Sequence, residues 1–288
     1  MLQDMPFGRL ENEFRVFPPK QGDIALCFRG NAVLLKRNPD DTLELPVIGT
    51  AACRDKDGSW SAWGEDSFRY IFRMEGKNYY LWMGEAGEPE DPAYGFESTR
   101  QLRQLVSKDV CFAIMTGWHL FVWYRNNRFC GCCGTATRHD EKERMLRCPN
   151  CGNMIFPRIS PAVIVAVTDG DRLLLTKYAG RGHTRYALIA GYTEIGETLE
   201  QTVQREVMEE VGLTVENLRY YKSQPWGVDG NVLMGFYCDL VGSDVVNLDQ
   251  NELALAQWHP RNAIPAEDDG ISLTREMIRV FAQGGEPR

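Results

Sequence analysis

One stretch of the sequence, GYTEIGETLEQTVQREVMEEVGL at residues 191–213, constrains the fold more than any other part of the chain. Thr198 and Gln201 have the spacing of a capping box, and Gly212 is typical of the residue that ends a helix. Between these ends, apolar residues recur at every fourth position: Leu199, Val203, Val207 and Val211. The spacing predicts one amphipathic helix with a buried stripe, preceded by a glycine-containing loop.

The same helix carries three glutamates close together. At about 100° per residue, Glu206 and Glu210 lie at nearly the same angle on the flank of the apolar stripe, and Glu209 is adjacent. Like charges at this spacing repel, and partial burial raises the pKa of a carboxyl group. A divalent cation that prefers oxygen ligands, Mg²⁺ or Mn²⁺, would compensate both effects. Judged by charge alone, the three glutamates would more simply be an acidic face exposed to solvent. The residues around them decide between this interpretation and a metal site.

The surrounding residues follow a fixed spacing. From Gly191 to Leu213 the stretch matches G-x5-E-x7-R-E-U-x-E-E-x-G-U at every fixed position, where U is aliphatic. It resembles the signature of the Nudix hydrolases. The resemblance implies a loop–helix–loop that holds divalent metal ions against a diphosphate, and hydrolysis of nucleoside diphosphates linked to another group.

The resemblance also implies roles for individual residues. The catalytic residues would be Glu209, Glu206, Glu210 and Arg205, with Glu209 as a metal ligand or as the base acting on water, and Arg205 orienting the glutamates. The ligands of Mg²⁺ or Mn²⁺ would be the carbonyl of Ala190 and the carboxylates of Glu206, Glu209, Glu210 and Glu252. For Glu197, pairing inside the loop and a part in catalysis are equally open.

Two matching C-x-x-C-G units hold four of the nine cysteines: Cys130, Cys133, Cys148 and Cys151. Fourteen residues separate the inner cysteines of the two units, Cys133 and Cys148. Two such pairs can supply four thiolates to one tetrahedral zinc ion, which predicts one structural Zn²⁺ per subunit. Disulfide bonds in a redox protein are the alternative. Cys132 is the spare cysteine of its unit, and we do not expect it to be a ligand.

The 288 residues are enough for about two domains of ordinary globular composition. Residues 24–37 and 68–85 each predict two strands joined by a turn, residues 97–108 predict a helix, and residues 111–130 fit a strand or a helix equally well. We expect an α+β protein with a mixed, β-rich N-terminal domain at 1–125, a small zinc ribbon at 126–155, and a Nudix α/β/α sandwich at 156–288.

Residues outside the helix narrow the resemblance to one group within the Nudix hydrolases. The zinc unit ahead of the Nudix part, the junction FPRISP at 156–161 and the segment SQPW at 223–226 look like the NAD(H) diphosphatases. That family continues as PFPxS after SQPW, whereas residues 227–231 here read GVDGN, which puts the fine substrate preference in doubt. The resemblance implies these substrate-binding residues: Phe156, Tyr192, Gln224, Trp226, Asn231, Glu143 and Thr274.

The expected activity is metal-dependent cleavage of the pyrophosphate of NAD(H) into AMP and nicotinamide mononucleotide. Removal of an NAD cap from RNA uses the same cut, although the net charge of −8 mildly favours small ligands. ADP-ribose or a diadenosine polyphosphate is another alternative, and a non-catalytic nucleotide sensor is a more distant one. The resemblance implies a homodimer. The sequence shows neither a signal peptide nor an apolar run of membrane-spanning length, so we expect a cytoplasmic protein.

Overall fold

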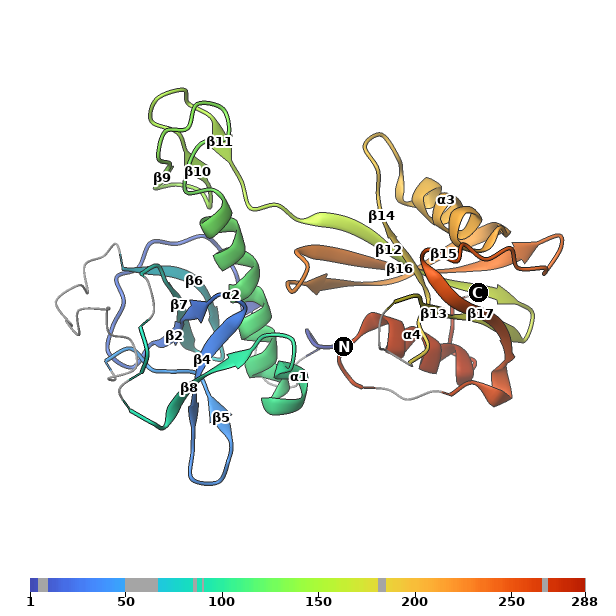
Figure 1. Ribbon diagram of the computed structural model, residues 1–288, viewed down its shortest axis with the longest axis horizontal. Coiled ribbons are helices and arrows are strands. Elements are labelled where there is room, and N and C mark those ends of the chain that lie inside the picture. The colour runs from blue at the N-terminus through green and yellow to red at the C-terminus, as the bar shows by residue number, and fades with distance from the viewer. Residues whose placement is uncertain are drawn as a thin grey trace. The chain divides into compact units, whose positions relative to one another are not determined.

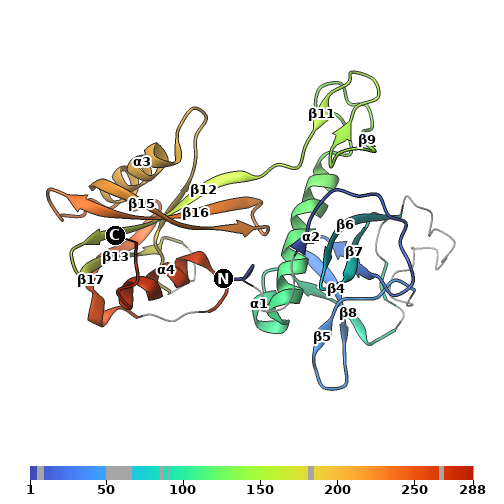
Figure 2. The same cartoon turned by 180° about the vertical axis from the view of Figure 1, so that it is seen from behind.

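The computed structural model describes residues 1–4, 10–49, 67–84, 87–89, 91–180, 185–265 and 269–287. The chain forms two compact units, each of which we describe by itself (Figures 1 and 2). Unit 1 contains Met1–Gln3, Ile159–Trp226 and Gly230–Arg288, and unit 2 contains Asp4–Arg158 and Gly227–Asp229. The division into three domains at residues 125 and 155 stays a prediction.

Unit 1 is built on one mixed sheet with the order β15-β16-β12-β13-β17, in which β14 also pairs with β12. Its strands are β12 (Ser160–Asp169), β13 (Arg172–Tyr178), β14 (Ile189–Tyr192), β15 (Thr214–Trp226), β16 (Asn231–Val241) and β17 (Leu253–Pro260). β12 runs parallel to β16 and antiparallel to β13 and β14. The last strand leads through the short 3-10 helix η2 (Arg261–Ala263) towards the terminal helix.

Both faces of this sheet are buried, because alternate residues of β12 enter two different cores. Val163, Val165 and Val167 pack with Val203, Val207 and Val211 of α3 (Leu199–Val211) in one core. Ile164 and Ala166 pack with Leu273, Met277 and Phe281 of α4 (Leu273–Ala282) in the other. Figures 1 and 2 show the two helices on opposite faces of the sheet. The predicted α/β/α sandwich in an α+β protein is confirmed.

The helix expected from the glutamate-rich stretch is also confirmed. The Thr198 hydroxyl accepts a hydrogen bond from the Gln201 backbone N–H at 3.2 Å, and the Gln201 side chain accepts one from the Thr198 N–H at 2.8 Å. The left-handed residue Gly212, with φ of 68°, ends the helix. Both ends of α3 are therefore fixed by local hydrogen bonds, which sets the rotation of its glutamates relative to the sheet.

The described residues of unit 2 form two small sheets, two helices and the zinc module. The first sheet has the order β1-β6-β7-β2, with β1 (Leu10–Glu11), β6 (Phe68–Met74), β7 (Lys77–Trp82) and β2 (Ile24–Leu26). The second joins β3 (Phe28–Arg29), β4 (Ala32–Arg37), β5 (Leu43–Glu44) and β8 (Tyr94–Ser98). The helices are α1 (Leu102–Leu105) and α2 (Lys108–Asn126), and the zinc module has β9 (Arg138–His139), β10 (Leu146–Arg147) and β11 (Met154–Ile155).

The two strands expected at 68–85 are confirmed as β6 and β7, whereas the first strand expected at 24–37 is divided into β2 and β3, which belong to different sheets. The predicted helix at 97–108 is largely wrong, because residues up to Ser98 pair with β4 and only one turn of helix follows. The ambiguous segment at 111–130 is mostly the helix α2. No helix among the described residues is long and apolar enough to cross a membrane.

Candidate active site

The glutamates of α3 differ sharply in their exposure to solvent. Glu206 is 8% exposed and Glu210 is 1% exposed, because both lie beside the valine stripe that packs on the sheet. The Glu209 side chain, one helical step away, is 60% exposed. The helix therefore turns two carboxylates inward and leaves the third facing solvent.

Arg205 joins Glu206 and Glu209 to the preceding loop. Its guanidinium donates to Glu206 at 2.8 Å and to Glu209 at 2.9 Å through Nη1. It reaches Glu197 through Nε at 2.6 Å and through Nη2 at 3.0 Å, and Nη2 also donates to the backbone carbonyl of Tyr192 at 2.9 Å. All five N–H groups of the guanidinium are thus engaged. A lysine could not hold the same five positions.

The contacts of Glu197 lie inside the loop and at the start of the helix. Besides Arg205, its carboxylate accepts hydrogen bonds from the Glu194 N–H at 3.0 Å and from the Thr202 hydroxyl at 3.1 Å. The hydrogen bonds from Arg205 lower the pKa of Glu197 to about 2, so it is ionised throughout the physiological range. This geometry favours the interpretation of Glu197 as a residue that pairs within the loop.

Gly191 is required by the position of Glu206. A Cβ atom at residue 191 would overlap the Glu206 carboxylate. The glycine therefore lets the carboxylate lie directly against the backbone of β14, where Arg205 also reaches it.

We predict that Gly191→Ala lowers kcat/KM by roughly 100-fold, because the new methyl group pushes the Glu206 carboxylate out of position. The melting temperature of unit 1 should change little, since the atoms that a Cβ would meet are the end of a flexible side chain, which can move. Gly95→Ala is the matched control, because a Cβ atom there meets nothing within 4 Å. Equal activity of both variants and the wild-type protein would show that the close approach of Gly191 to Glu206 has no catalytic consequence.

Glu210 is a buried carboxylate without a hydrogen-bond partner in the part of the chain that the structure describes. Neither of its oxygens accepts a hydrogen bond from the described residues. Burial, followed by the charges of Glu206 and Glu252, raises its pKa to about 8. The backbone N–H of Ala190 faces the carboxylate and acts in the opposite direction, although it does not form a hydrogen bond. A buried acid of this kind is destabilising unless a positive charge compensates it.

The same environment acts on the neighbouring carboxylates. Burial raises the pKa of Glu206, and the charges of Glu209 and Glu252 act in the same direction against the hydrogen bond from Arg205. Asp249 adds a further negative charge near Glu210, and its N–H donates to the Glu210 carbonyl at 2.9 Å. Sequence reasoning did not select Asp249, although it lies only three residues before Glu252. The site gathers more negative charge than Arg205 can neutralise.

This donor set fits Mg²⁺ or Mn²⁺. Both ions prefer oxygen ligands, and the two buried Glu210 oxygens are among the polar atoms that have no hydrogen-bond partner within the described residues. The residues that would hold an ion are the predicted set, Ala190, Glu206, Glu209, Glu210 and Glu252, and their assignment as ligands stays a prediction.

Tyr192 and Asn231 form a reciprocal pair beside the loop. The Tyr192 hydroxyl lies 3.2 Å from Asn231 Oδ1, and Asn231 Nδ2 lies 3.1 Å from the hydroxyl oxygen. Asn231 is buried, whereas Tyr192 is 51% exposed. The pair fixes the tyrosine with much of its ring open to solvent, which suits stacking on a flat base.

The side chain of Gln224, a residue of β15, reaches the start of α4, where Thr274 lies, but the two residues have different surroundings. The Gln224 side chain is fully buried, accepts a hydrogen bond from the Leu273 N–H at 2.8 Å and donates to the Ile271 carbonyl at 2.7 Å. These bonds give Gln224 a structural role at the helix N-terminus, and its contact with substrate stays a prediction. Thr274 is partly exposed in the first turn, and Trp226 is partly exposed at the end of β15.

Phe156 and Glu143, the other two predicted substrate-binding residues, belong to unit 2. Phe156 is 52% exposed just after β11, and Glu143 is exposed in the turn between β9 and β10. Unit 2 also contains residues 227–229, where the chain departs from the family pattern. A Cβ atom at Gly227 would overlap the backbone carbonyl of Met115 in α2. A proline cannot occupy that position in this packing.

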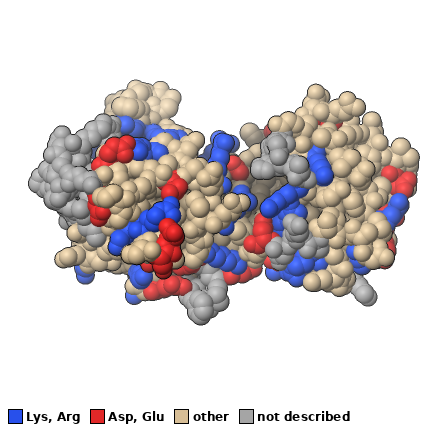
Figure 3. All heavy atoms as spheres, turned by 60° about the horizontal axis from the view of Figure 1, so that its bottom comes forward, with Lys and Arg blue, Asp and Glu red and all other residues tan. Residues whose placement is uncertain are grey.

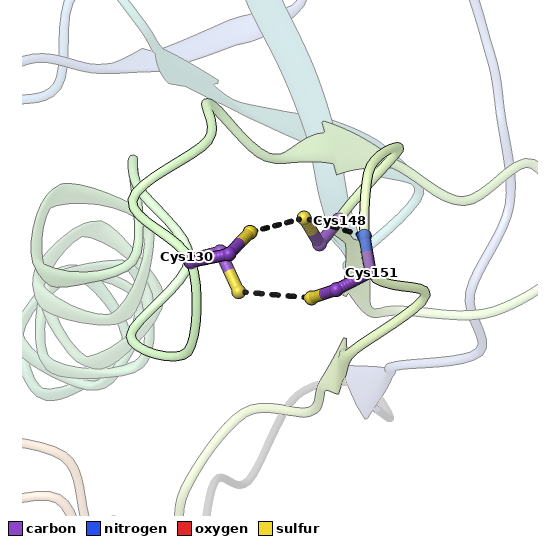
Figure 4. A group of neighbouring side chains, drawn as sticks. Cys130, Cys148 and Cys151 are labelled. Carbon is purple, nitrogen blue, oxygen red and sulfur yellow. Dashed lines mark hydrogen bonds between the residues drawn. The ribbon is translucent and has the colours of Figure 1, made fainter.

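The four predicted zinc ligands converge in the zinc module. The sulfur atoms of Cys130, Cys133, Cys148 and Cys151 all lie within 4.8 Å of one another. The Cys130–Cys151 and Cys133–Cys148 distances are 3.6 and 3.4 Å, close to the roughly 3.8 Å edge of a tetrahedron with Zn–S bonds of about 2.3 Å. Figure 4 shows the thiols pointing toward one another from two loops.

The backbone supports these sulfur atoms as a zinc site requires. The N–H of Cys132 points at the Cys130 sulfur at 3.4 Å, and the N–H of Cys151 points at the Cys148 sulfur at 3.5 Å. Cys132 is exposed and stands outside the group of four. Four thiolates complete a tetrahedral shell, so the site suits a structural zinc ion with no position for a substrate.

Comparison with known proteins matches the two parts of the chain that carry these residues. The chain matches the NUDIX domain over residues 158–281 and the NADH pyrophosphatase zinc ribbon domain over residues 125–156. It is 34% identical over 221 residues to the NAD-capped RNA hydrolase NudC of Pectobacterium atrosepticum, which covers 76% of this chain and 81% of that protein. The NudC of Haemophilus influenzae strain PittEE is 36% identical over 72% of this chain and 78% of its own length.

Other similarities are more partial. The NudC of Pseudomonas aeruginosa strain LESB58 is 40% identical over 160 residues, so the chain spans 57% of the length of that relative. A Nudix hydrolase from Nitrosomonas europaea has a TM-score of 0.47 at 24% identity, covering 54% of this chain and 90% of that structure. The family models and the Pectobacterium and Haemophilus similarities together show that the chain belongs to the Nudix family, in the branch that carries the NADH pyrophosphatase zinc ribbon and includes NudC.

Proposed function

We propose that this protein hydrolyses the pyrophosphate bond of NAD(H), either as the free dinucleotide or as the cap of an RNA, with Mg²⁺ or Mn²⁺ as the cofactor. The observation that carries the proposal is Glu210, a carboxylate 1% exposed whose oxygens have no partner among the described residues. A binding module without a reaction to perform has no need for such a destabilising group beside Glu206 and Glu252.

The residues of the site divide the work of an in-line hydrolysis. A bound divalent cation would neutralise phosphate oxygens and make a water molecule easier to deprotonate. Arg205 holds one oxygen of Glu209 at 2.9 Å, and within the described part of the chain the other oxygen has no hydrogen-bond partner. Glu209 can therefore accept the proton as water attacks phosphorus. The P–O bond of the pyrophosphate then breaks and a mononucleotide leaves.

We further propose recognition residues for the two ends of the dinucleotide. Tyr192, held by Asn231, offers a partly open ring for stacking on adenine or nicotinamide. Trp226, Thr274, Phe156, Glu143 and Gln224 complete the proposed substrate contacts, with Gln224 acting through the start of α4. The family resemblance also leads us to propose a homodimer in the cytoplasm, which light scattering and cell fractionation test.

The test is a product assay with NADH, NAD⁺, ADP-ribose, a diadenosine polyphosphate and NAD-capped RNA, each with Mg²⁺ and with Mn²⁺. We expect AMP and nicotinamide mononucleotide from NAD(H), and 5′-monophosphate RNA from the capped substrate. If ADP-ribose or the diadenosine polyphosphate is cleaved faster than NAD(H) and NAD-capped RNA, the proposed substrate is wrong.

Glu209→Gln should lower kcat by about 10²- to 10⁴-fold with nearly unchanged stability, because it removes the proton acceptor from an exposed position. Glu200→Gln is the matched control, since Glu200 is an exposed glutamate in the first turn of the same helix. Loss of turnover with retained dinucleotide binding would support catalysis. If Glu209→Gln turns over substrate at the wild-type rate, Glu209 is not the base that accepts the proton from water.

A further inference from the structure

The segment before β17, residues 246–252, lies against the C-terminal end of α3. The last carbonyl groups of a helix have no partner inside the helix, so another part of the chain can bind them. Here the Asn247 N–H donates to the Val211 carbonyl at 2.9 Å. The Asp249 N–H donates to the Glu210 carbonyl, also at 2.9 Å. Two backbone hydrogen bonds therefore dock this segment beside the residue whose carboxylate is buried.

Side chains of the same segment add to this docking. Val246 and Leu248 pack against the core that contains the valines of α3. A Cβ atom at Gly212, the residue that ends α3, would lie 2.9 Å from the Cβ atom of Asn247. The helix end and the segment are thus in close contact, and the turn that follows Leu248 starts from a fixed point.

Asp249 shapes the turn that leads to Glu252. Its Oδ1 accepts hydrogen bonds from the backbone N–H and from Nδ2 of Asn251, both at 2.9 Å. Its backbone carbonyl accepts the Glu252 N–H at 3.2 Å and the Leu253 N–H at 2.9 Å. An aspartate that accepts the N–H two residues later closes a turn with its own side chain. The path of the backbone from α3 to Glu252 is thereby fixed.

The backbone of Glu252 is also held from the sheet. Its carbonyl accepts the Ala179 N–H at 2.8 Å, directly after β13. β17 begins at the next residue and pairs with β13. Glu252 thus stands where the turn joins the sheet, and its charge raises the pKa of both Glu206 and Glu210.

The charge of Asp249 does not explain its place in this turn. On the face drawn in Figure 3, acidic side chains are interspersed with basic ones. Residues 242–259, in contrast, contain three acidic residues and no lysine or arginine. Among the described residues, the hydrogen bonds to the Asp249 side chain come from Asn251 alone. Asp249 therefore adds repulsion to the carboxylate site, and what it supplies is the set of hydrogen bonds that closes the turn.

We propose that Asp249 is a positioning residue of the metal site, because its turn keeps the Glu252 carboxylate beside those of Glu206 and Glu210. The inference rests on the proposed function and deepens it, since it names a residue that acts on the site without binding the ion or the substrate. Removing a group that orients a metal ligand typically weakens metal binding by about 10- to 100-fold. An effect of that kind is expected here through Glu252.

The test measures the dissociation constant of Mn²⁺ by electron paramagnetic resonance, with the full chain and without substrate. Asp249→Ala and Asp249→Asn both remove the negative charge, but the asparagine oxygen can still accept the hydrogen bonds of the turn. We expect Asp249→Ala to weaken Mn²⁺ binding by about 10-fold, whereas Asp249→Asn keeps most of the wild-type affinity. Asn251→Ala keeps the charge and removes one of the two hydrogen bonds to Oδ1, so its affinity should lie between those of Asp249→Ala and the wild type. It replaces Asp249→Ala if that variant fails to fold.

A second measurement separates the positioning of Glu252 from a general loosening of the segment. In a Glu252→Ala background there is no carboxylate at residue 252 to place. The difference in Mn²⁺ affinity between alanine and asparagine at residue 249 should therefore disappear in that background. Melting temperatures of the metal-free variants report their folding independently, because a purely structural role of Asp249 would change these temperatures without changing the affinity for Mn²⁺.

Asp91→Ala is the matched control. The Asp91 side chain accepts the Ala93 N–H at 2.9 Å, and its backbone carbonyl accepts the Tyr94 N–H at 3.0 Å. This is the same local turn as at Asp249, but it belongs to unit 2, which does not contain the carboxylates of α3. The variant should bind Mn²⁺ with wild-type affinity.

Three results would overturn the proposal. Equal weakening by Asp249→Ala and Asp249→Asn would assign Asp249 a role through its charge or as a ligand. Wild-type affinity of Asp249→Ala would leave it no role at the metal site. A difference between alanine and asparagine that persists in the Glu252→Ala background would show that Glu252 is not the residue that Asp249 positions. The proposed function fails separately, if the wild-type protein binds Mn²⁺ but cleaves none of the dinucleotides.

Discussion

Replacing Glu210 with glutamine is expected to make the metal-free protein more stable and the enzyme nearly inactive. The pKa of Glu210 is raised from 4.5 to about 8 by burial first and then by Glu206 and Glu252. In the unfolded chain this group ionises near its ordinary pKa, whereas in the folded protein it resists ionisation. The free energy of unfolding is therefore highest below about pH 4.5 as far as this group is concerned, and decreases as pH rises toward 8.

Because glutamine carries no charge, Glu210→Gln removes this decrease in the free energy of unfolding at higher pH. At pH 8 without divalent ions, we expect Glu210→Gln to raise the free energy of unfolding of unit 1 by on the order of 2–4 kcal/mol, or roughly 5–10 °C in melting temperature. With ions present, the variant should bind Mn²⁺ more than about 100-fold more weakly and lose turnover in proportion. Calorimetry with and without Mn²⁺, at pH 6 and pH 8, measures both effects.

Glu209→Gln is the control for the expected gain in stability of Glu210→Gln, because it also removes a glutamate of the site. Its side chain is 60% exposed, so glutamine should give no comparable gain in stability at pH 8. A Glu210→Gln variant that melts at or below the wild-type temperature in the metal-free state would contradict the description of Glu210 as an uncompensated buried acid.

Loss of a zinc ligand should unfold the zinc module. Structural zinc sites of four cysteines contribute about 10–16 kcal/mol of apparent binding free energy near pH 7, and this energy folds the loops that supply the ligands. Cys148→Ser removes a ligand that is only 1% exposed, flanked by a strand of two residues. We expect loss of the zinc ion, rapid amide exchange across residues 130–152, and cleavage of that segment by protease.

Cys132→Ser tests whether loss of zinc and loss of protection require the removal of one of the four predicted ligands, or follow from replacing any cysteine of the loop. Cys132 lies in the same loop but is exposed and outside the thiol group, so the variant should keep one zinc ion and normal protection. Retention of one zinc ion by Cys148→Ser, with unchanged amide exchange, would show that the four cysteines do not form a common site.

The features that the sequence predicted best depend on local spacing. The capping box of α3 and its stripe of valines need only residues within the helix, and both appear as expected. The convergence of the four cysteines follows from short C-x-x-C spacings. In contrast, residues 97 and 98 were expected in a helix but pair with β4, because a strand partner more than 60 residues away decides their conformation.

The geometry that depends on distant residues could not be predicted. The motif selects Gly191 but not the overlap with Glu206 that makes glycine necessary. Tyr192 and Asn231 were each selected, but their mutual hydrogen bonds join two strands separated by almost 40 residues of chain. The departure from the family pattern at Gly227 has a packing reason, since a larger residue would overlap the Met115 carbonyl.

Diffraction from crystals soaked with Mn²⁺ and a non-hydrolysable dinucleotide tests the central claim most directly. Anomalous scattering should place manganese within about 2.2 Å of carboxylate oxygens of Glu206 and Glu210, with phosphate oxygens on its other side. Crystals of Glu210→Gln grown and soaked in the same way should show reduced or no anomalous density there. An absence of manganese beside Glu206 and Glu210 in fully soaked wild-type crystals would contradict the assignment of this carboxylate cluster as the catalytic metal site.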